Sequence, residues 1–364
     1  MVEYEDKITE LEKELSNTKY NKRTQHHIGL VKAKLAHLKE KQEARRTGGK
    51  KGEGYSVRKS GDATVLLLGF PSVGKSTLLN DLTHADSRIG AYDFTTLTVI
   101  PGLLEYNHAK IQILDVPGIV KGAASGRGRG KEVLAVLRNA DLALIIVDVQ
   151  HPGTLDIIKR EVYDVGIRLD QKRPDVRIRR TAKDGVRVGK TVKLNILTDD
   201  TIQDILKEFR ITNAEILIRE PITDDQLIDV IEGNRVYMPS LIVLNKVDLA
   251  PVQKLEEVKI KVKPDLCISA LNKQGIEELK KLIFDKLELI RIYMKQQGKP
   301  ADMKVPLIMK KGSSVKDVCE KIHREFVTKF KFVRVTGRSA KFPGQKLTLK
   351  HVLQDEDIVE LHLS

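Results

Sequence analysis

The sequence predicts an α/β protein built around a doubly wound, mostly parallel sheet. Four short segments, at 64–70, 111–118, 142–149 and 241–248, begin with nearly unbroken apolar runs. Such runs are expected for strands that are covered on both faces. Helical patterns separate the runs, and that alternation is typical of βαβ units.

Length and composition limit the alternatives. A chain of 364 residues, 41% of them apolar, is long enough for several domains. No run approaches the ~18 apolar residues of a membrane span, so a membrane protein is excluded. The N-terminus lacks the features of a signal peptide, and we expect a cytoplasmic location. Cys267 and Cys319 lie in unrelated segments and favour two ordinary thiols.

Residues 3–45 predict two helices that form a hairpin broken near residues 16–18. Each helix has one apolar stripe at helical spacing, formed by Ile8, Leu11 and Leu15 in the first and by Ile28, Val31, Leu35 and Leu38 in the second. Residues 47–62 are rich in glycine and charge and predict a linker. The N-terminal region is therefore set at residues 1–60.

About 90 residues separate the third apolar run from the fourth, far more than a βαβ crossover needs. We expect an inserted α+β subdomain at residues 167–234. Its predicted elements are a β-hairpin turning at Asp184-Gly185, a strand at 191–197, a helix at 200–209 with Thr201 as an alternative N-cap, a strand at 214–220 and a helix ending at Gly233. The sheet domain then comprises residues 61–166 and 235–296.

The C-terminal part predicts a further domain. A helix is expected over Ile276–Met294, and the break at 298–300 precedes a last unit at residues 302–364. There a hairpin-like start, a helix over Val315–Phe326 and returning strands are consistent with a ubiquitin-like β-grasp domain.

Positive charge is concentrated in three segments. Residues 19–59 contain 13 lysines and arginines against 3 acids, a net +10. Residues 168–193 have 10 against 3, a net +7, and residues 304–364 have 13 against 7, a net +6. Clustered positive charge favours polyanions, which predicts a nucleic-acid or ribonucleoprotein partner.

A phosphate-binding loop follows the first apolar run. The motif G-x-x-x-x-G-K-[ST] and the residue after it are formed by Gly69, Phe70, Pro71, Ser72, Val73, Gly74, Lys75, Ser76 and Thr77. An ordinary glycine turn is the alternative, but the strand before and the helical pattern after it disfavour that interpretation. Lys75 is expected to reach the β- and γ-phosphates, and the Ser76 hydroxyl to bind Mg²⁺.

A second motif, Asp115-Val-Pro117-Gly118, ends the second apolar run. At this place an acid can hold Mg²⁺ through water, and the Gly118 amide can contact the γ-phosphate. Between the two motifs lies a polar segment, Asp93-Phe94-Thr95-Thr96. We expect it to be the first switch loop, with the Thr96 hydroxyl completing the Mg²⁺ shell in the triphosphate state.

The fourth apolar run ends in Asn245-Lys246-Val-Asp248, which predicts the base. A carboxylate at Asp248 can accept from both the ring N–H and the exocyclic amine of guanine, whereas adenine presents an acceptor at the ring position. Ser269-Ala270-Leu271 would add a backbone N–H to the guanine oxygen. GTP and GDP are therefore the expected ligands, and an ATPase is disfavoured.

The order of these motifs resembles the Obg-like branch of the translation-factor-related GTPases. The glycine-rich continuation GIVKGAASGRGRGKEVLAVLRNAD narrows the resemblance to the developmentally regulated GTP-binding protein (DRG) family. The resemblance implies a P-loop GTPase domain with an inserted α+β subdomain and a C-terminal TGS domain. It also implies GTP hydrolysis, association with the ribosome or ribosomal RNA, and, in eukaryotic relatives, a dedicated stabilising partner protein.

Two departures concern the mechanism. Ile119 stands where Ras-type enzymes have a water-orienting glutamine, and isoleucine forms no hydrogen bond through its side chain. Many Obg-like relatives have asparagine at the fourth position of the phosphate loop, where it helps to hold a catalytic K⁺. This chain has Ser72 there, which leaves K⁺ activation open.

The second switch loop, with Pro117, Gly118, Ile119 and Gly122, also contains Arg127 and Arg129. These arginines could approach the γ-phosphate as internal arginine fingers, or face solvent or ribosomal RNA. Two functions stay in competition: a GTPase whose nucleotide state controls ribosome binding, and a nucleotide-stabilised RNA-binding scaffold with negligible turnover.

Overall fold

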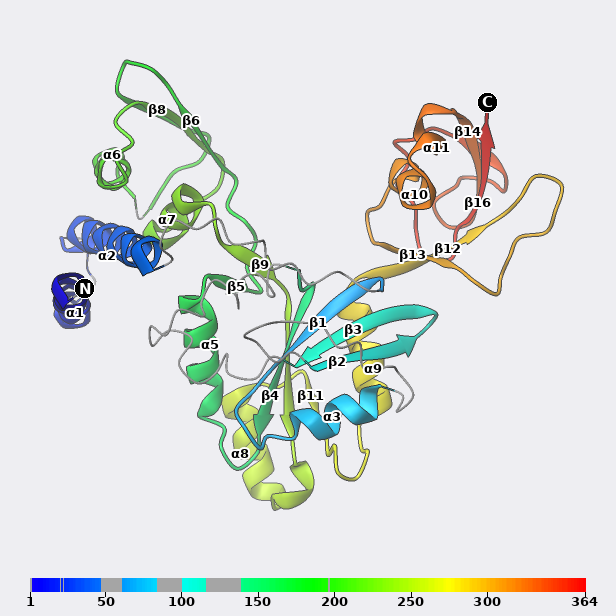
Figure 1. The fold of residues 1–364 in the computed structure, drawn as a ribbon, viewed down its shortest axis with the longest axis horizontal. Coiled ribbons are helices and arrows are strands. Elements are labelled where there is room, and N and C mark those ends of the chain that lie inside the picture. The colour runs from blue at the N-terminus through cyan, green and yellow to red at the C-terminus, as the bar shows by residue number, and fades with distance from the viewer. Residues whose placement is uncertain are drawn as a thin grey trace. The chain divides into compact units, whose positions relative to one another are not determined.

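The fold was analysed in a computed structural model (Figure 1). It describes residues 2–19, 21, 23–46, 61–83, 100–115, 139–195 and 197–364. The chain forms two compact units. One contains the N-terminal helices and residues 162–237, and the other contains the central sheet and the C-terminal domain. No helix in the described part of the chain is long and apolar enough to cross a membrane.

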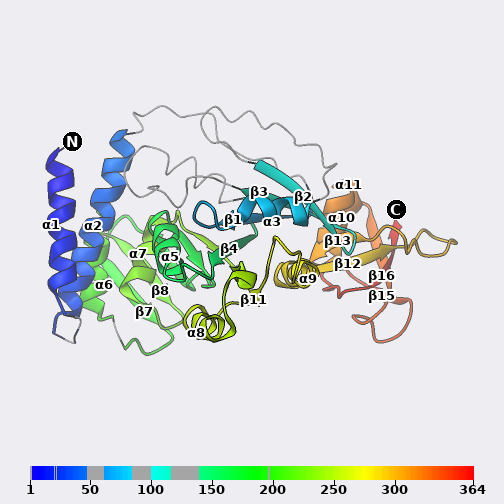
Figure 2. The same cartoon turned by 90° about the horizontal axis from the view of Figure 1, so that it is seen from below.

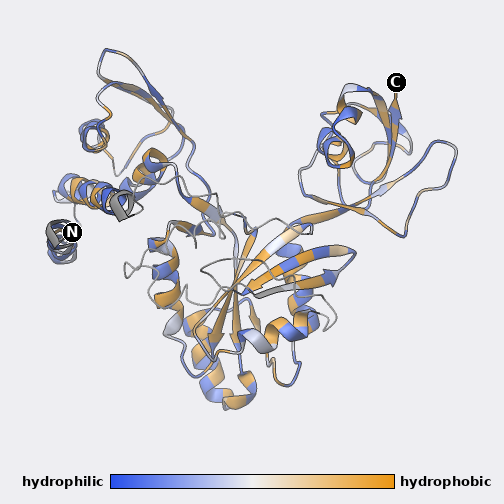
Figure 3. Ribbon diagram, viewed as in Figure 1, coloured by the Kyte–Doolittle hydropathy of each residue, from blue (hydrophilic) through white to orange (hydrophobic). Residues whose placement is uncertain are grey.

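The central sheet has six strands in the order β11–β10–β4–β1–β3–β2 (Figure 1). The bounds are β1 Ala63–Leu68, β2 Ile100–Tyr106, β3 Ala109–Asp115, β4 Leu142–Asp148, β10 Ser240–Asn245 and β11 Leu266–Cys267. All neighbours pair in parallel except β2 and β3. Every residue of β1 and β4 is buried, and Figure 3 shows these strands as hydrophobic. The four predicted strands are confirmed.

Strand β2 has no counterpart in the sequence analysis. Pro101 and Gly102 mask its pattern, and a proline is tolerated there because β2 is an edge strand. A Cβ on Gly102 would lie 2.5 Å from Cγ2 of Thr83, so only glycine lets the strand pass this close to the helix that precedes it. Asn107 and His108, both with positive φ, form the two-residue turn to β3.

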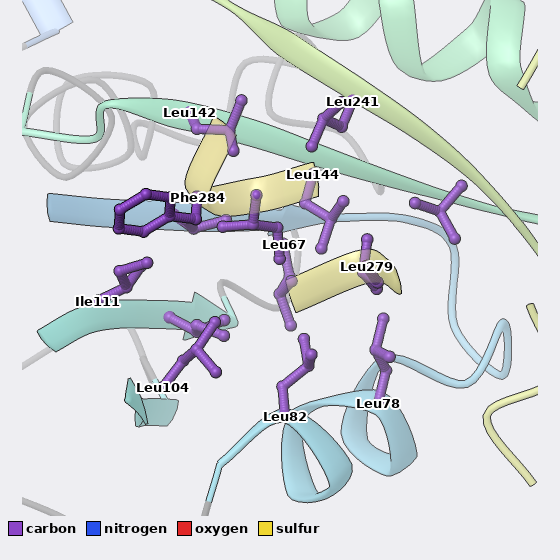
Figure 4. Close-up of a cluster of buried hydrophobic side chains, with 14 of the residues drawn as sticks. Leu67, Leu78, Leu82, Leu104, Ile111, Leu142, Leu144, Leu241, Leu279 and Phe284 are labelled. Atoms are coloured by element: carbon purple, nitrogen blue, oxygen red, sulfur yellow. The ribbon is translucent and has the colours of Figure 1, made fainter. Parts of the chain in front are cut away.

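The helical elements of the sheet domain among the described residues are α3 Lys75–Leu82, α5 Thr154–Asp164, η1 Val247–Leu249, α8 Val252–Val262 and α9 Ile276–Lys286. Its main core lies between the sheet and helices α3 and α9. Figure 4 shows Leu67 and Leu144 from the sheet facing Leu78 of α3 and Leu279 of α9. All four side chains are fully buried, and each buried leucine contributes about 1.5–3 kcal/mol.

The predicted helix over Ile276–Met294 is wrong beyond Lys286. Glu288 has a positive φ of 50°, which ends the helical path, and residues Leu289–Met294 form strand β12. The alternation of Ile290 and Ile292 with Arg291 and Tyr293 is the period of a strand, not of a helix. The C-terminal sheet therefore begins before residue 302.

The C-terminal domain is a five-stranded sheet in the order β13–β12–β16–β14–β15. Its other elements are β13 Leu307–Lys310, α10 Val315–Ile322, α11 Glu325–Thr328, β14 Phe330–Thr336, β15 Gln345–Leu347 and β16 Ile358–Leu363. The predicted helix over Val315–Phe326 is divided, because His323 is extended at the end of α10. Two ion pairs join this domain to the central sheet domain, Lys310 to Asp141 at 2.6 Å and Lys321 to Asp62 at 3.1 Å.

The N-terminal hairpin is confirmed as α1 Val2–Asn17 and α2 Gln25–Arg46, which lie side by side (Figure 2). Helix α2 also packs on the inserted subdomain, through a second face that its sequence pattern does not show. This face uses small residues: Ala33 is fully buried, and a Cβ on Gly29 would lie 3.4 Å from Thr201. Lys32 adds ion pairs of 3.0 Å to Asp224 and 2.7 Å to Asp225.

The inserted subdomain contains a three-stranded sheet in the order β6–β8–β7. Its elements are β5 Ile167–Leu169, β6 Val176–Arg180, β7 Val186–Lys190, α6 Asp199–Glu208, β8 Ala214–Ile218, α7 Asp224–Glu232 and β9 Val236–Met238. The predicted hairpin is wrong: Asp184 and Gly185 turn with positive φ, but β8 lies between β6 and β7 and pairs with both. Strands β6 and β7 are both rich in basic residues, and each pairs with the more apolar strand β8 instead of with the other.

Two further details of this subdomain differ from the prediction. Residues 191–195 and 197–198 form no strand, and Leu197 is buried as an anchor before α6. Thr198, not Asp200 or Thr201, caps α6, because its side chain accepts from the Thr201 amide. The helix ending at Gly233 is confirmed, with Thr223 and Gln226 forming a capping box.

A buried ion-pair cluster stabilises the subdomain where it joins the rest of the chain. Arg168 donates to both carboxylate oxygens of Asp229, at 2.6 and 2.7 Å, and its guanidinium lies 3.6 Å from the ring centre of Tyr163. Arg235 donates to the same carboxylate at 2.8 Å. Burial opposes the charge of Arg168, but the bonds to Asp229 outweigh it and raise the pKa. Arg168, counted among the basic residues of 168–193, is thus not on the surface.

Replacing Arg168 by methionine should destabilise the protein by about 3 kcal/mol, because the substitution leaves the buried Asp229 carboxylate with Arg235 alone. Thermal unfolding followed by circular dichroism would measure this effect. Arg177→Met is the matched control, since that side chain is exposed and should change stability by about 0.5 kcal/mol or less. Equal effects of the two substitutions would contradict the structural role of Arg168.

Candidate nucleotide site

The predicted motifs meet at one edge of the central sheet. Strands β1, β3, β4, β10 and β11 are parallel, so their carboxyl ends share this edge, where ligands of open α/β sheets bind. Asp115 ends β3 beside Leu67 of β1, and Asn245 of β10 pairs in register with Asp148 of β4. The topology thus places the phosphate-loop and guanine motifs together.

The loop after β1 has the backbone that phosphate binding requires. Ser72 and Gly74 have positive φ values of 66° and 96°, and α3 begins directly after Gly74. Such a loop directs backbone amides and a helix N-terminus towards an anion. A Cβ on Gly69 would lie 2.9 Å from the Ile146 carbonyl oxygen, so glycine is required there. Pro71, Ser72, Ser76 and Thr77 are exposed.

The Lys75 ammonium lies within the loop. Its Nζ donates to the carbonyl oxygens of Gly69 at 2.8 Å and Phe70 at 2.9 Å. Burial lowers its pKa, and the nearby Asp115 opposes that shift. A phosphate in the loop would add a full negative charge beside this half-buried cation and favour its protonated form.

Asp115 has a buried carboxylate with an unsatisfied oxygen. The residue is 4% exposed, and its Oδ1 has no hydrogen-bond partner among the described residues. Burial raises its pKa, and Lys75 offsets part of the shift. A metal-bound water would satisfy this oxygen, so Asp115 fits a Mg²⁺ shell. Ser76 would supply the second protein oxygen.

Asn245, the last residue of β10, connects two loops. Its side-chain amide donates to the Val73 carbonyl oxygen at 2.8 Å, and its Oδ1 accepts from the Ala270 amide at 3.0 Å. The residue is 1% exposed, so both bonds are shielded from water. A Cβ on Gly74 would lie 2.4 Å from Nδ2 of Asn245, which explains why this position in the phosphate loop is glycine.

The sequence analysis missed Asp148 as a site residue. Its Oδ2 accepts from Nζ of Lys246 at 2.7 Å, and its Oδ1 accepts from the Gln150 amide at 2.8 Å. Lys246 itself has a positive φ of 63°. The signal was an acid at the end of the third apolar run, at the same strand end as Asn245. Asp148 orients the Lys246 side chain along the site.

The remaining guanine-motif residues lie at the same edge. Asp248 is exposed and accepts no hydrogen bond from the described residues, so its carboxylate is free for a ligand. The amides of Ser269 and Ala270 donate to Gln274 and Asn245. Of the three amides in the segment predicted to supply one backbone N–H, that of Leu271 alone has no acceptor within the described part of the chain.

The predicted switch residues lie in two segments that are not among the described residues. Asp93, Phe94, Thr95 and Thr96 fall outside the described residues, as do Pro117, Gly118, Ile119, Gly122, Arg127 and Arg129. Their predicted roles stay predictions.

Known families cover most of the chain. Residues 64–179 match the family described as 50S ribosome-binding GTPase, and residues 183–289 match the C-terminal region of that domain. Residues 290–363 match the TGS domain, and that match begins within β12. With the phosphate loop and parallel sheet described above, the protein is a GTP-binding P-loop GTPase with a C-terminal TGS domain. Such GTPases generally work with Mg²⁺.

Relatives that match nearly the whole chain identify the family within the class of P-loop GTPases. An uncharacterized GTP-binding protein of Methanocaldococcus jannaschii is 52% identical over 361 residues, covering 98% of this chain and 92% of that protein. Another, of Halobacterium salinarum, is 46% identical over 364 residues, and developmentally-regulated GTP-binding protein 2 of Bos taurus is 42% identical over 359 residues. Both cover 98% of each chain. The chain belongs to the developmentally regulated GTP-binding protein family.

The buried Asp115 predicts opposite effects on stability and on metal binding. Because folding raises its pKa, the carboxyl favours the fold at low pH and loses that contribution as pH rises through the raised pKa. Asp115→Asn should therefore make the nucleotide-free protein about 1 kcal/mol more stable at pH 7. The gain over wild type should shrink as pH falls, and Mg²⁺-dependent GTP binding should weaken.

Thermal unfolding at pH 5 and 7, with and without Mg²⁺ and GTP, would measure both effects. A variant less stable than wild type without nucleotide at pH 7 would contradict a desolvated carboxylate at this position.

Proposed function

We propose that the protein hydrolyses GTP to GDP and phosphate, and that its nucleotide state controls association with the ribosome or translation machinery in the cytoplasm. Asn245 carries the nucleotide part of this proposal, because it ties the phosphate loop to the guanine-binding loop at the strand ends. The match of residues 64–179 to the family described as 50S ribosome-binding GTPase supports the ribosome part. A dedicated stabilising partner protein is part of the proposal.

The proposed residue roles follow the geometry. The backbone from Gly69 to Thr77 would hold the phosphates, with Lys75 at the β- and γ-phosphates. Ser76 and Asp115 would hold Mg²⁺, with Thr96 completing the shell. Asp248 would accept from guanine, while Asn245 and Lys246 position the loop around it.

Replacing Asp248 by asparagine tests base recognition. Asparagine offers an amide donor where guanine also has a donor, so GTP binding should weaken by ~2 kcal/mol or more. Xanthosine triphosphate should bind better, because xanthine has an acceptor at that position. Calorimetric titration with both nucleotides would measure the change, and an unaltered GTP affinity would exclude Asp248 from the site.

We further propose that intrinsic hydrolysis is slow and stimulated by K⁺. Ile119 provides no group to orient water, and the exposed Ser72 provides one hydroxyl oxygen at the turn of the phosphate loop. The hydrolysis rate should therefore be higher in K⁺ than in Na⁺ at equal ionic strength.

Phosphate release at saturating GTP in the two salts is the measurement. Ile119→Ala should change this rate little, since the isoleucine has no proposed chemical role. Equal hydrolysis rates in K⁺ and Na⁺ would exclude K⁺ as an activator. A large loss of the hydrolysis rate in Ile119→Ala would assign that side chain a role in the chemical step.

The second candidate is an RNA-binding scaffold with negligible turnover, favoured by the same lack of a glutamine after Gly118. Phosphate release with and without ribosomes separates the two functions. The ribosome proposal itself predicts stronger co-sedimentation with ribosomes in a non-hydrolysable GTP analogue than in GDP. Equal pelleting in the two nucleotides would contradict nucleotide control.

A further inference from the structure

One face of the inserted sheet is lined by arginines and is open to solvent. Side chains along β6, β7 and β8 alternate between two faces. The inner face contributes Val176, Ile178, Val186, Val188, Ala214, Ile216 and Ile218 to the core with α6 and α7. The outer face, which we name the arginine face, consists of Arg177, Arg179, Arg187, Gly189, Glu215 and Leu217.

The strand register orders this face in two rows. Arg177, Leu217 and Gly189 lie across the three strands in one row. Arg179, Glu215 and Arg187 form the next row. Arg177 and Arg179 are thus about 6.6 Å apart along β6, and Arg179 and Arg187 are about 9.6 Å apart across the sheet.

The charges on this face are largely uncompensated. Its three arginines and Glu215 are all exposed, and the net charge is +2. Arg177 and Arg179 form no ion pair with any described residue, and Arg187 has one exposed contact of 3.5 Å to Asp184. An exposed pair of this kind contributes little.

Exposed helices of the same chain differ from this pattern. Lys259, Lys280 and Lys329 each pair with an acid one turn away, at 2.7–2.8 Å. On the arginine face, Arg177 and Arg179 have no such partner among the described residues, and the contact of Arg187 to Asp184 is longer, at 3.5 Å. Lys183, in the segment between β6 and β7, is also exposed and forms no ion pair with the described residues. The net charge of the arginine face therefore gives a positive local field.

The side chains on this face favour RNA over a protein partner. Stable protein interfaces depend on buried aromatic or aliphatic anchors, whereas this face has one half-buried apolar side chain, Leu217. All three of its cations are arginines, whose planar guanidinium binds phosphate through two parallel hydrogen bonds. Their two-residue spacing along β6 is comparable with that of successive phosphates on one strand.

We propose that the arginine face is a docking surface for the phosphate backbone of RNA. The proposal deepens the ribosome association proposed above, because it names the surface and the chemistry of the ligand. Arg177, Arg179 and Arg187 contact phosphates. These contacts neutralise phosphate charge and do not distinguish one base sequence from another.

The test is the salt dependence of RNA binding by the full chain. The probe is a fluorescein-labelled single-stranded oligouridine, measured by anisotropy over a salt series. Arg177→Gln, Arg179→Gln and Arg187→Gln are combined in one variant. Each lost phosphate contact on a single strand lowers the slope of log K against log salt by about 0.7, so the slope should fall by about 2.

A matched control removes the same charge elsewhere. The control variant combines Lys254→Gln, Lys261→Gln and Lys281→Gln, at exposed positions of α8 and α9. It should leave the slope nearly unchanged. Arg→Lys at the three positions of the arginine face keeps the charge and should keep the slope. All six positions are exposed, so thermal unfolding and GTP affinity of the variants should equal those of wild type.

Equal slopes for the glutamine variant and the lysine control would overturn the proposal. Unaltered oligouridine binding with lost ribosome pelleting would also overturn it, and would assign the face to an acidic protein surface. A wild-type chain that binds oligouridine through the arginine face but does not pellet with ribosomes would refute the proposed function and leave this inference standing.

Discussion

The nucleotide site depends on two hydrogen bonds made by one buried amide. Asn245 binds the Val73 carbonyl of the phosphate loop and the Ala270 amide of the guanine-side loop, and it lies at the end of strand β10 of the central sheet. Neither loop has regular structure of its own, and each is fixed by a side chain that the sheet positions. Asn245 therefore couples the position of the phosphate loop to the position of the loop at Ala270.

The sequence predicted those parts of the structure whose pattern is local. Buried strands and the phosphate loop have strong signals in consecutive residues, and β1, β4 and β10 lie where expected. Predictions failed where a partner distant in sequence decides the outcome. The inserted hairpin was wrong because β8 separates β6 from β7, and no local pattern shows which strand pairs with which. Small residues on α2 hid its second packing face in the same way.

The same distinction between local patterns and distant partners applies to the residues of the nucleotide site. Motif spacing predicted the positions of Lys75, Asp115 and Asn245 at one sheet edge, because parallel strands bring their ends together. The bond from Asp148 to Lys246 required the register of β4 against β10. The net charge of each segment predicted where basic residues are concentrated, but not which of their side chains are exposed. Arg168 is buried against Asp229, while Arg177 and Arg179 of the same segment are exposed and form no ion pair with the described residues.

Strand β12 has an arrangement with a wider consequence. Leu289 of β12 and Ile308 of β13 belong to the core of the sheet domain, whereas their neighbours Ile290 and Met309 belong to the core of the TGS domain. One hairpin therefore completes two cores, with no linker between them. The two domains are not interchangeable modules: an evolutionary exchange of the TGS domain would have to bring a strand whose alternate side chains fit the GTPase core of the recipient. Residues of this hairpin that face the GTPase core and residues that face the TGS core are therefore expected to covary among related chains.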